Sequence, residues 1–289
     1  MYRSDCNTNY AAIRRRRLTI CFYLIFLMVT AGPFQAAVAH SWPPPINAGE
    51  WGNTIALTVL DDSLYTIEKS GALYRTDLTT GKWVQLGKAE FSHTAFLFAH
   101  NQSLYTIETD GSLYRVSPAD GSWNRVGQAG DWRGTQALVV LYNNLYTVER
   151  SGVLYRTNLT SFRWVKLGKA EFGNTRFMFA NSPNLYTIEA DGSLYRVSPV
   201  HGGWSKVGSA GAWGNTIVGT TLNGRIYSVE SNGALYETYP SSGAWKQIGK
   251  AEFRNSQFIF GAGTSLYTIE GGGLYRINPS NGTWVEVGK

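Results

Sequence analysis

The sequence has few of the residues from which metal centres and redox sites are built. It contains two cysteines and four histidines in 289 residues. Both cysteines, Cys6 and Cys21, lie in an N-terminal segment that we expect to be removed, so the mature protein has neither a disulfide nor thiol chemistry. The histidines are His40, His93, His100 and His201. They occupy unrelated positions, which predicts no metal site, and no cofactor is indicated either.

The N-terminal segment has the three parts of a secretory signal. Arginines at 14–17 precede an apolar run from Leu18 to Ala31, and the small residues 37–39 follow. A run of about 14 residues is shorter than the roughly 20 that cross a bilayer as a helix. We expect cleavage after Ala39 and a secreted or periplasmic product with no membrane span. An uncleaved anchor with a slightly longer span is the alternative.

The chain lacks the charge and motifs of several functional classes. Five of its 26 basic and one of its 20 acidic residues lie in 1–39, which leaves 21 basic and 19 acidic residues and a net charge of +2. A balance this close to neutral predicts no nucleic-acid partner. There is no phosphate loop, dinucleotide fingerprint or Ser-His-Asp arrangement.

What the chain does have is a repeated unit. The motif Leu-Tyr-Thr-Ile-Glu, or a close variant, recurs at spacings of 40, 41, 40, 41 and 40 residues, and its tyrosines are Tyr65, Tyr105, Tyr146, Tyr186, Tyr227 and Tyr267. In each unit a Leu-Tyr motif and a Trp follow. The second unit contains four short β-prone runs at 95–99, 104–108, 113–116 and 123–126, with Asp110-Gly111 as a hairpin turn.

Four antiparallel strands in about 40 residues make one propeller blade. The sequence therefore predicts an all-β, six-bladed β-propeller over residues 47–289. It follows the signal at 1–39 and a proline-rich stub at 40–46, and we expect a monomer. The prolines of the stub, Pro43 to Pro45, cannot donate ladder hydrogen bonds, so Trp284 to Val287 should complete the last blade and unit 1 should dock on unit 6. The sequence leaves open whether one strand is also exchanged across this seam.

A double period of 81 residues overlies the single one. Odd units begin with Ala-Gly-x-Trp and even units with Lys-Ala-Glu-Phe. Even units carry bulky pairs such as Phe96 and Phe98, where odd units carry small ones such as Ala56 and Thr58. Two interpretations stay open, namely complementary packing between neighbouring blades, large against small, and two classes of binding site.

Glutamates close the repeated strand in every unit. We expect each one to pair with an arginine of the next strand, which keeps it ionised and structural. The predicted pairs are Glu68 with Arg75, Glu108 with Arg115, Glu149 with Arg156, Glu189 with Arg196, and Glu270 with Arg276. In unit 5, Glu237 replaces the arginine and is expected beside Glu230 as an unpaired acid.

The loop that opens each unit is the candidate ligand site. It combines an aromatic residue with glycine and short polar residues, and an indole face with an amide suits a sugar. The candidate residues are Gly49, Trp51, Asn53, Gly130, Trp132, Asn174, Gly211, Trp213, Asn215 and Asn255. The alternative is that the aromatic packs between blades while Asn and Thr serve the turn.

The blade motif resembles that of the tachylectin-type β-propeller lectins. The likeness rests on Phe96-Leu97-Phe98, Leu104-Tyr105, Asp110, Leu113-Tyr114, Ser117-Pro118, Trp123 and Val126-Gly127, and it covers about residues 47 to 288. The Gly-Gly-Trp that opens their blade corresponds to Ala-Gly-x-Trp here. The resemblance implies binding of N-acetylated sugars in pockets between adjacent blades.

We therefore expect a carbohydrate-binding lectin whose partners are glycans on a surface or glycoprotein. The alternatives are an exported protein-binding propeller scaffold and, less favoured, an enzyme with a site on the propeller axis. A scaffold predicts a single patch on one side of the ring, whereas a lectin predicts equivalent pockets repeated around it. An enzyme predicts clustered departures from the repeat, and the chain is close to symmetric.

Overall fold

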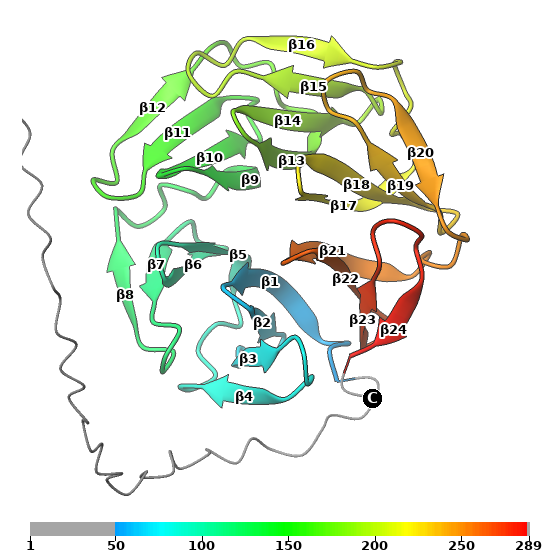
Figure 1. Cartoon of the computed structure of the whole chain (residues 1–289). Coiled ribbons are helices and arrows are strands. Elements are labelled where there is room, and N and C mark those ends of the chain that lie inside the picture. The colour runs from blue at the N-terminus through cyan, green and yellow to red at the C-terminus, as the bar shows by residue number, and fades with distance from the viewer. Residues whose placement is uncertain (1–49, 288–289) are drawn as a thin grey trace, which may run out of the picture. The chain divides into compact units, whose positions relative to one another are not determined.

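A computed structural model describes residues 50–287. They form six antiparallel four-stranded sheets and no helix, and the sheets are arranged in a ring (Figure 1). The predicted six-bladed β-propeller is confirmed. The signal segment, the stub and Gly49 lie outside the described residues. The described part of the chain contains no helix that could span a membrane.

The first strands of the blades line the centre of the ring (Figure 1). These inner strands are β1 (Thr54–Leu60), β5 (Thr94–His100), β9 (Thr135–Leu141), β13 (Thr175–Asn181), β17 (Thr216–Leu222) and β21 (Ser256–Ala262). The second strands are β2 (Ser63–Glu68), β6 (Ser103–Glu108), β10 (Asn144–Glu149), β14 (Asn184–Glu189), β18 (Arg225–Glu230) and β22 (Ser265–Glu270). The third strands are β3 (Leu73–Asp77), β7 (Leu113–Val116), β11 (Leu154–Asn158), β15 (Leu194–Val197), β19 (Leu235–Thr238) and β23 (Gly273–Ile277). The outermost strands are β4 (Trp83–Leu86), β8 (Trp123–Val126), β12 (Trp164–Leu167), β16 (Trp204–Val207), β20 (Trp245–Ile248) and β24 (Trp284–Glu286).

Side-chain alternation gives each blade two different faces. In blade 1, Tyr65 and Ile67 of β2 pack with residues of blade 2, such as Leu97. Leu64, on the other face of β2, packs with Phe260 of blade 6. One apolar cluster fills each of the six junctions in this way, so the core is a ring of interfaces between blades.

The 81-residue period appears as two kinds of junction. Inner strands approach each other closely in pairs, β1 with β5, β9 with β13, and β17 with β21, and less closely at the other three junctions. At the close junction of blades 1 and 2, the small Ala56 meets Leu97. At the wider junction of blades 2 and 3, Phe96 and Phe98 pack with the next blade.

Alternate bulk along the inner strands therefore serves packing, but the predicted packing of large residues against small ones in the next blade is wrong. The large phenylalanines of blade 2 do not face the small positions of the next blade. They face Leu138 and Val140 and share the wider junction with the indole of Trp132. The larger side chains of the inner strands lie at the wider junctions, because a gap left unfilled there would lose dispersion contacts.

The junction that closes the ring, between blades 6 and 1, has the same backbone contact as the other five junctions. At each junction the backbone N–H of the loop aromatic donates to a carbonyl in the hairpin of the preceding blade. Trp51 N donates to Gly272 O at 3.0 Å, as Trp132 N does to Gly111 O at 3.1 Å. As predicted, β24 completes the last blade and blade 1 docks on blade 6. Every blade is built from four strands that are consecutive in sequence.

The hairpin glycine of each blade is required at this contact. Gly71 has a φ of +87°, and a Cβ on it would lie 2.7 Å from the backbone nitrogen of Ser92 in the next loop. Any other residue at this position would strain its own backbone and also push the neighbouring blade away.

Candidate functional site

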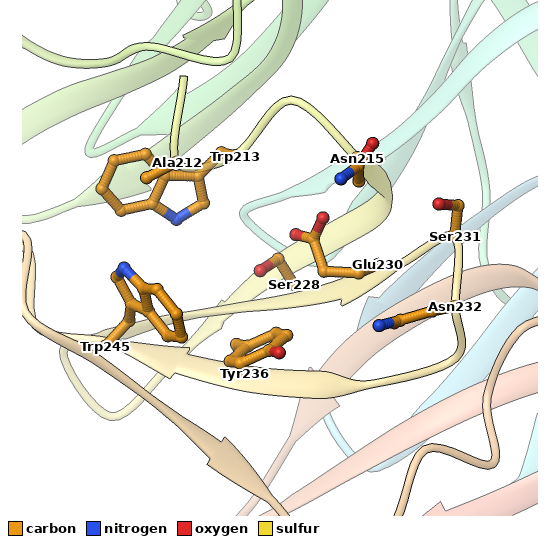
Figure 2. Close-up of a pocket in the computed structure, with 9 residues that line it drawn as sticks. All are labelled: Ala212, Trp213, Asn215, Ser228, Glu230, Ser231, Asn232, Tyr236 and Trp245. Carbon is orange, nitrogen blue, oxygen red and sulfur yellow. The ribbon is translucent and has the colours of Figure 1, made fainter. Parts of the chain in front are cut away.

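Pockets of one kind recur on the blade face that is turned toward the preceding blade, near its outer strands. We call them blade pockets. In blade 5 the side chains that define the pocket are Trp213, Asn215, Glu230, Tyr236 and Trp245 (Figure 2). Equivalent pockets lie in blades 1, 3, 4 and 6. All lining residues of a pocket come from one repeat, so two adjacent blades do not share the lining as the lectin resemblance implies.

The pockets are small. Their volumes are about 480 Å³ in blade 1, 310 Å³ in blade 3, 190 Å³ in blade 5, 220 Å³ in blade 4 and 150 Å³ in blade 6. Clefts for drug-sized ligands hold roughly 300–1,000 Å³. Most of the blade pockets therefore fit a compact group such as a single ring.

A perpendicular pair of aromatic rings forms the outer wall of each pocket. Tyr236 on β19 and Trp245 on β20 meet edge to face, with ring centroids 4.9 Å apart. The other five blades repeat this geometry at 4.9–5.2 Å and 82–90°. Five of the six indoles, those of Trp123, Trp164, Trp204, Trp245 and Trp284, are 46–52% exposed. These five pairs thus offer an open aromatic surface on a rigid sheet, and the pair of blade 1 is partly covered.

A glutamate lies in the pocket beneath these rings. In blade 5 the register shifts between Thr216 and Val218, and this β-bulge places Thr216 opposite Glu230. The Thr216 hydroxyl donates to Glu230 Oε1 at 2.8 Å. Blades 1 to 4 repeat this hydrogen bond at 2.8–2.9 Å. In blade 6 the backbone N–H of Asn255 donates to Glu270 instead, at 3.0 Å.

Burial raises the pKa of this glutamate in every blade, and the Thr hydroxyl only partly opposes the effect. In blade 6 the Asn255 N–H opposes it in the same way. The raised pKa follows because a charged carboxylate loses hydration in the pocket.

The predicted pairs between these glutamates and arginines are wrong. The register places Arg75 opposite Tyr65, so Arg75 and Glu68 lie on opposite faces of blade 1. The same register holds in blades 2, 3, 4 and 6. The glutamates are therefore not held by ion pairs with these arginines, and their carboxyl groups lie on the pocket face.

Glu237 is not the unpaired acid that the sequence suggested. It lies opposite Tyr227, on the face away from Glu230. It forms salt bridges with Arg225, at 3.3 Å, and with Lys246, at 2.9 Å. The other repeats have Ser or Asn at the position of Arg225. In blade 5 the arginine therefore lies on β18, at position 225, and a glutamate takes the arginine position on β19. The charge of Glu237 is compensated by Arg225 and Lys246.

The predicted loop tryptophans are mostly structural. Trp51, Trp132 and Trp213 are only 6%, 4% and 2% exposed. The indole N–H of Trp213 donates to Thr238 Oγ1 at 3.3 Å. The alternative interpretation of these loops, that the aromatic packs between blades, therefore holds for most of each indole. One edge of each still lines its pocket.

The other predicted site residues divide into three groups. Three of the asparagines line pockets, namely Asn53, Asn174 and Asn215. Asn255 acts through its backbone on Glu270. Gly130 and Gly211 shape the loop, with φ of +87° and +75°, and do not line the pockets.

The residues that sequence reasoning missed are the exposed aromatic pairs, such as Tyr236 with Trp245, and the glutamate beneath them. The signal was present in the alternation of β19. Leu235 is buried in the core, so its neighbour Tyr236 has to face the other side, where Trp245 lies diagonally across the ladder.

No group of three or more His, Cys, Asp or Glu residues within 50–287 is arranged to hold a metal ion. His100 instead joins blades 2 and 3, where its Nε2 is 2.7 Å from Asn143 Oδ1.

No protein-family model and no curated protein matches the chain. Solved structures do match. PorZ, an essential bacterial surface component of the type-IX secretion system of Porphyromonas gingivalis, is 13% identical over 85% of this chain, with a TM-score of 0.56. This chain spans only 34% of PorZ. A protein of unknown function from Bacteroides thetaiotaomicron is 13% identical over 75% of this chain and 66% of its own, with a TM-score of 0.58. YCF48 bound to D1 peptide is 14% identical over 86% of this chain and 85% of its own, with a TM-score of 0.56. At identities this low, the structural match shows that the chain shares the propeller fold with these proteins and nothing beyond the fold.

Proposed function

We propose that the protein is an exported lectin that binds uncharged sugars, N-acetylated ones among them, in its blade pockets and catalyses no reaction. The observation that carries this proposal is the repetition of one pocket around the ring, with an aromatic pair above a glutamate that is buried or half-buried. The resemblance to tachylectin-type lectins supports the same ligand class.

The chemistry of the pocket suits a pyranose ring. The apolar C–H face of a sugar packs on an indole, and Trp245 presents its ring to solvent beside the phenol of Tyr236. Hydroxyl and acetamido groups need both donors and acceptors. Asn215 provides both, and Glu230 has a second oxygen beyond the one that Thr216 uses.

Buried polar atoms without a partner also favour a polar ligand. In blade 5, Ser228 lines the pocket and is fully buried, and its hydroxyl has no hydrogen-bond partner among the described residues. In blade 1, the Thr76 hydroxyl and the Trp83 indole nitrogen are also buried without a hydrogen-bond partner, and both residues line the pocket. A buried polar group without a partner costs about 1–3 kcal/mol, which a hydroxyl-rich ligand would recover.

The charge of the pockets argues against acidic glycans. The blade 5 pocket contains Glu230 and no basic residue. The blade 1 pocket contains Glu50, Glu68 and Lys69, which sum to one negative charge. A sialylated, sulfated or phosphorylated sugar would therefore meet like charge at short range.

The scaffold alternative is less well supported by the surface. It expects one dominant patch, whereas similar pockets recur in at least five blades. The YCF48 structure contains a bound peptide, so propellers of this size can take one. Peptide binding is the outcome to which a negative sugar test would point.

A glycan array tests the proposal directly. The purified protein is applied to N-acetylglucosamine, N-acetylgalactosamine and neutral and sialylated oligosaccharides at several coating densities. We expect retention on uncharged N-acetylated sugars, competition by the free sugar and no retention on sialylated ones. If no glycan retains the protein at any density, the lectin proposal is wrong.

A further inference from the structure

The opening loops of odd and even blades differ by one residue. The loop from Gly168 to Phe172 is one residue shorter than the loop from Gly208 to Trp213, which contains the additional Gly211. Gly211 has a φ of +75° and Gly130, its counterpart in blade 3, has a φ of +87°. This additional residue produces the 40 and 41 spacing of the repeats. It also changes where the acidic side chain of the loop can reach.

In even blades this side chain occupies the indole N–H of the exposed tryptophan. The Trp204 Nε1 donates to Glu171 Oε2 at 3.1 Å. Blade 2 repeats the bond between Trp123 and Glu90 at 3.0 Å, and blade 6 repeats it between Trp284 and Glu252 at 3.1 Å. The glutamate in each case is the residue before the loop phenylalanine. We call this hydrogen bond the latch.

In odd blades the latch is missing. Blade 3 has Asp131 at this position, and its carboxylate instead accepts the backbone N–H of Gln128 at 3.2 Å. Blade 5 has Ala212, which has no carboxylate. Blade 1 does have a glutamate at this position, Glu50, and it lines the pocket. The indole nitrogen of Trp83 nevertheless has no hydrogen-bond partner among the described residues, so the latch is not formed in blade 1 either. Within 50–287 the indole N–H groups of Trp83, Trp164 and Trp245 have no hydrogen-bond partner. In Figure 2 the indole nitrogen of Trp245 is on the side of its ring that faces Trp213.

The even pockets are also more acidic than the odd ones. The blade 4 pocket contains Glu171, Glu189 and Asp191, three formal negative charges with no basic residue. The blade 3 pocket contains Asp131, Glu149 and Arg150, which sum to one negative charge. A ligand oxygen that accepted the Trp204 indole N–H would have to displace Glu171, and an acetamido oxygen would then meet this carboxylate as one acceptor facing another.

We propose, building on the lectin function, that the three odd blades are the working sites and that the latch glutamates Glu90, Glu171 and Glu252 close the even ones. The carboxylate of the latch takes the place of a ligand oxygen on the indole N–H. The odd indoles keep this donor for a hydroxyl or acetamido oxygen of the sugar. The protein is then a trivalent lectin with one site in every second blade.

The test follows each indole N–H by two-dimensional NMR of the whole protein labelled with ¹⁵N-tryptophan, during titration with the methyl β-glycoside of N-acetylglucosamine. Single Trp→Phe variants assign the signals. We expect the signals of Trp83, Trp164 and Trp245 to shift with the sugar, and those of Trp123, Trp204 and Trp284 to stay in place.

Opening the latch supplies the second measurement. The triple variant E90A/E171A/E252A should make the three even indoles responsive, so the number of sugar equivalents bound should double. D131A removes an acid at the same loop position in an odd blade and serves as the matched control, with no expected gain in sites.

The outcomes separate this inference from the proposed function. If all six indoles shift together in the unaltered protein, or if the triple variant gains no sites, the latch inference is wrong and the lectin function stands. If no indole responds to any sugar that the array offers, the lectin function is wrong and the inference falls with it.

Discussion

Replacement of the buried loop tryptophan should damage the fold, whereas replacement of the exposed tryptophan in the same pocket should not. Trp213 is 2% exposed and Trp245 is 52% exposed, although both line the blade 5 pocket. Burial of an indole to the extent seen for Trp213 removes on the order of 200 Å² of its surface from water. At about 25 cal/mol per Å², this burial stabilises the fold by about 5 kcal/mol. Trp213→Ala keeps only the small share of this area that a methyl group covers.

The hydrogen bond of Trp213 adds to this loss. The fully buried Thr238 hydroxyl accepts the indole N–H, so the alanine variant leaves Thr238 without this donor, at a cost of about 1 kcal/mol. We expect W213A to lose about 4–5 kcal/mol of unfolding free energy. Trp245→Ala removes about half as much buried area and one edge-to-face contact, and we expect it to lose about 2–3 kcal/mol.

Urea denaturation of both variants and of the unaltered protein, followed by circular dichroism, measures the difference. If W213A unfolds at nearly the midpoint of the unaltered protein, the loop indole is not part of the junction core. If W245A loses as much as W213A, the outer aromatic pair is structural and the aromatic wall of the pocket has been misinterpreted.

Three further predictions concern charge and valency. Burial raises the pKa of Glu189 above the ordinary value of 4.5, so the folded protein holds a proton there that the unfolded chain releases, and stability should fall as pH rises through this range. Glu189→Gln should remove the part of this dependence that Glu189 contributes, reduce the slope and stabilise the protein at neutral pH, and urea midpoints between pH 4.5 and neutrality with an unchanged slope would contradict this. Glu237→Arg should lower the thermal midpoint because it places like charge beside Arg225 and Lys246, and the added change Arg225→Ser, which recreates the other repeats, should restore most of it. Trp164→Ala should barely reduce retention on a densely glycosylated surface, whereas W83A/W164A/W245A should abolish it because multivalent contact is lost, with Val165→Ala on the opposite face of β12 as the control.

The fold could be predicted because the same sequence unit is repeated six times, and each copy shows the same pattern of strands and turns. Six copies with four β-prone runs each fix the number of blades, and the prolines at 43–45 led us to expect the last strand from the C-terminal end of the described chain, where β24 lies. The junctions between blades needed the structure. The sequence shows that Phe96 is large and Ala56 is small, but only the structure shows that they belong to junctions of different width.

The candidate site was predicted only in part, and the reason is the strand register. A diagonal pairing of Glu68 with Arg75 assumes that both side chains lie on one face of the blade. The hairpin instead aligns Ile67 with Leu73 and Tyr65 with Arg75, which puts the glutamate on the other face. A shift of one residue exchanges the faces of a strand. The carboxyl group that sequence reasoning set aside as structural therefore lies in the pocket.

The double period connects packing at the centre of the ring to chemistry at its outer strands. The wider junctions require a tryptophan in the opening loop, and these are the loops that carry the additional residue in blades 3 and 5. Where the loop is short, a phenylalanine fills the closer junction and the glutamate before it reaches the outer indole. The two interpretations of the period that the sequence left open are therefore compatible. Large and small residues alternate for packing along the inner strands, and on our proposal the same loops decide which outer indoles are free to meet a sugar.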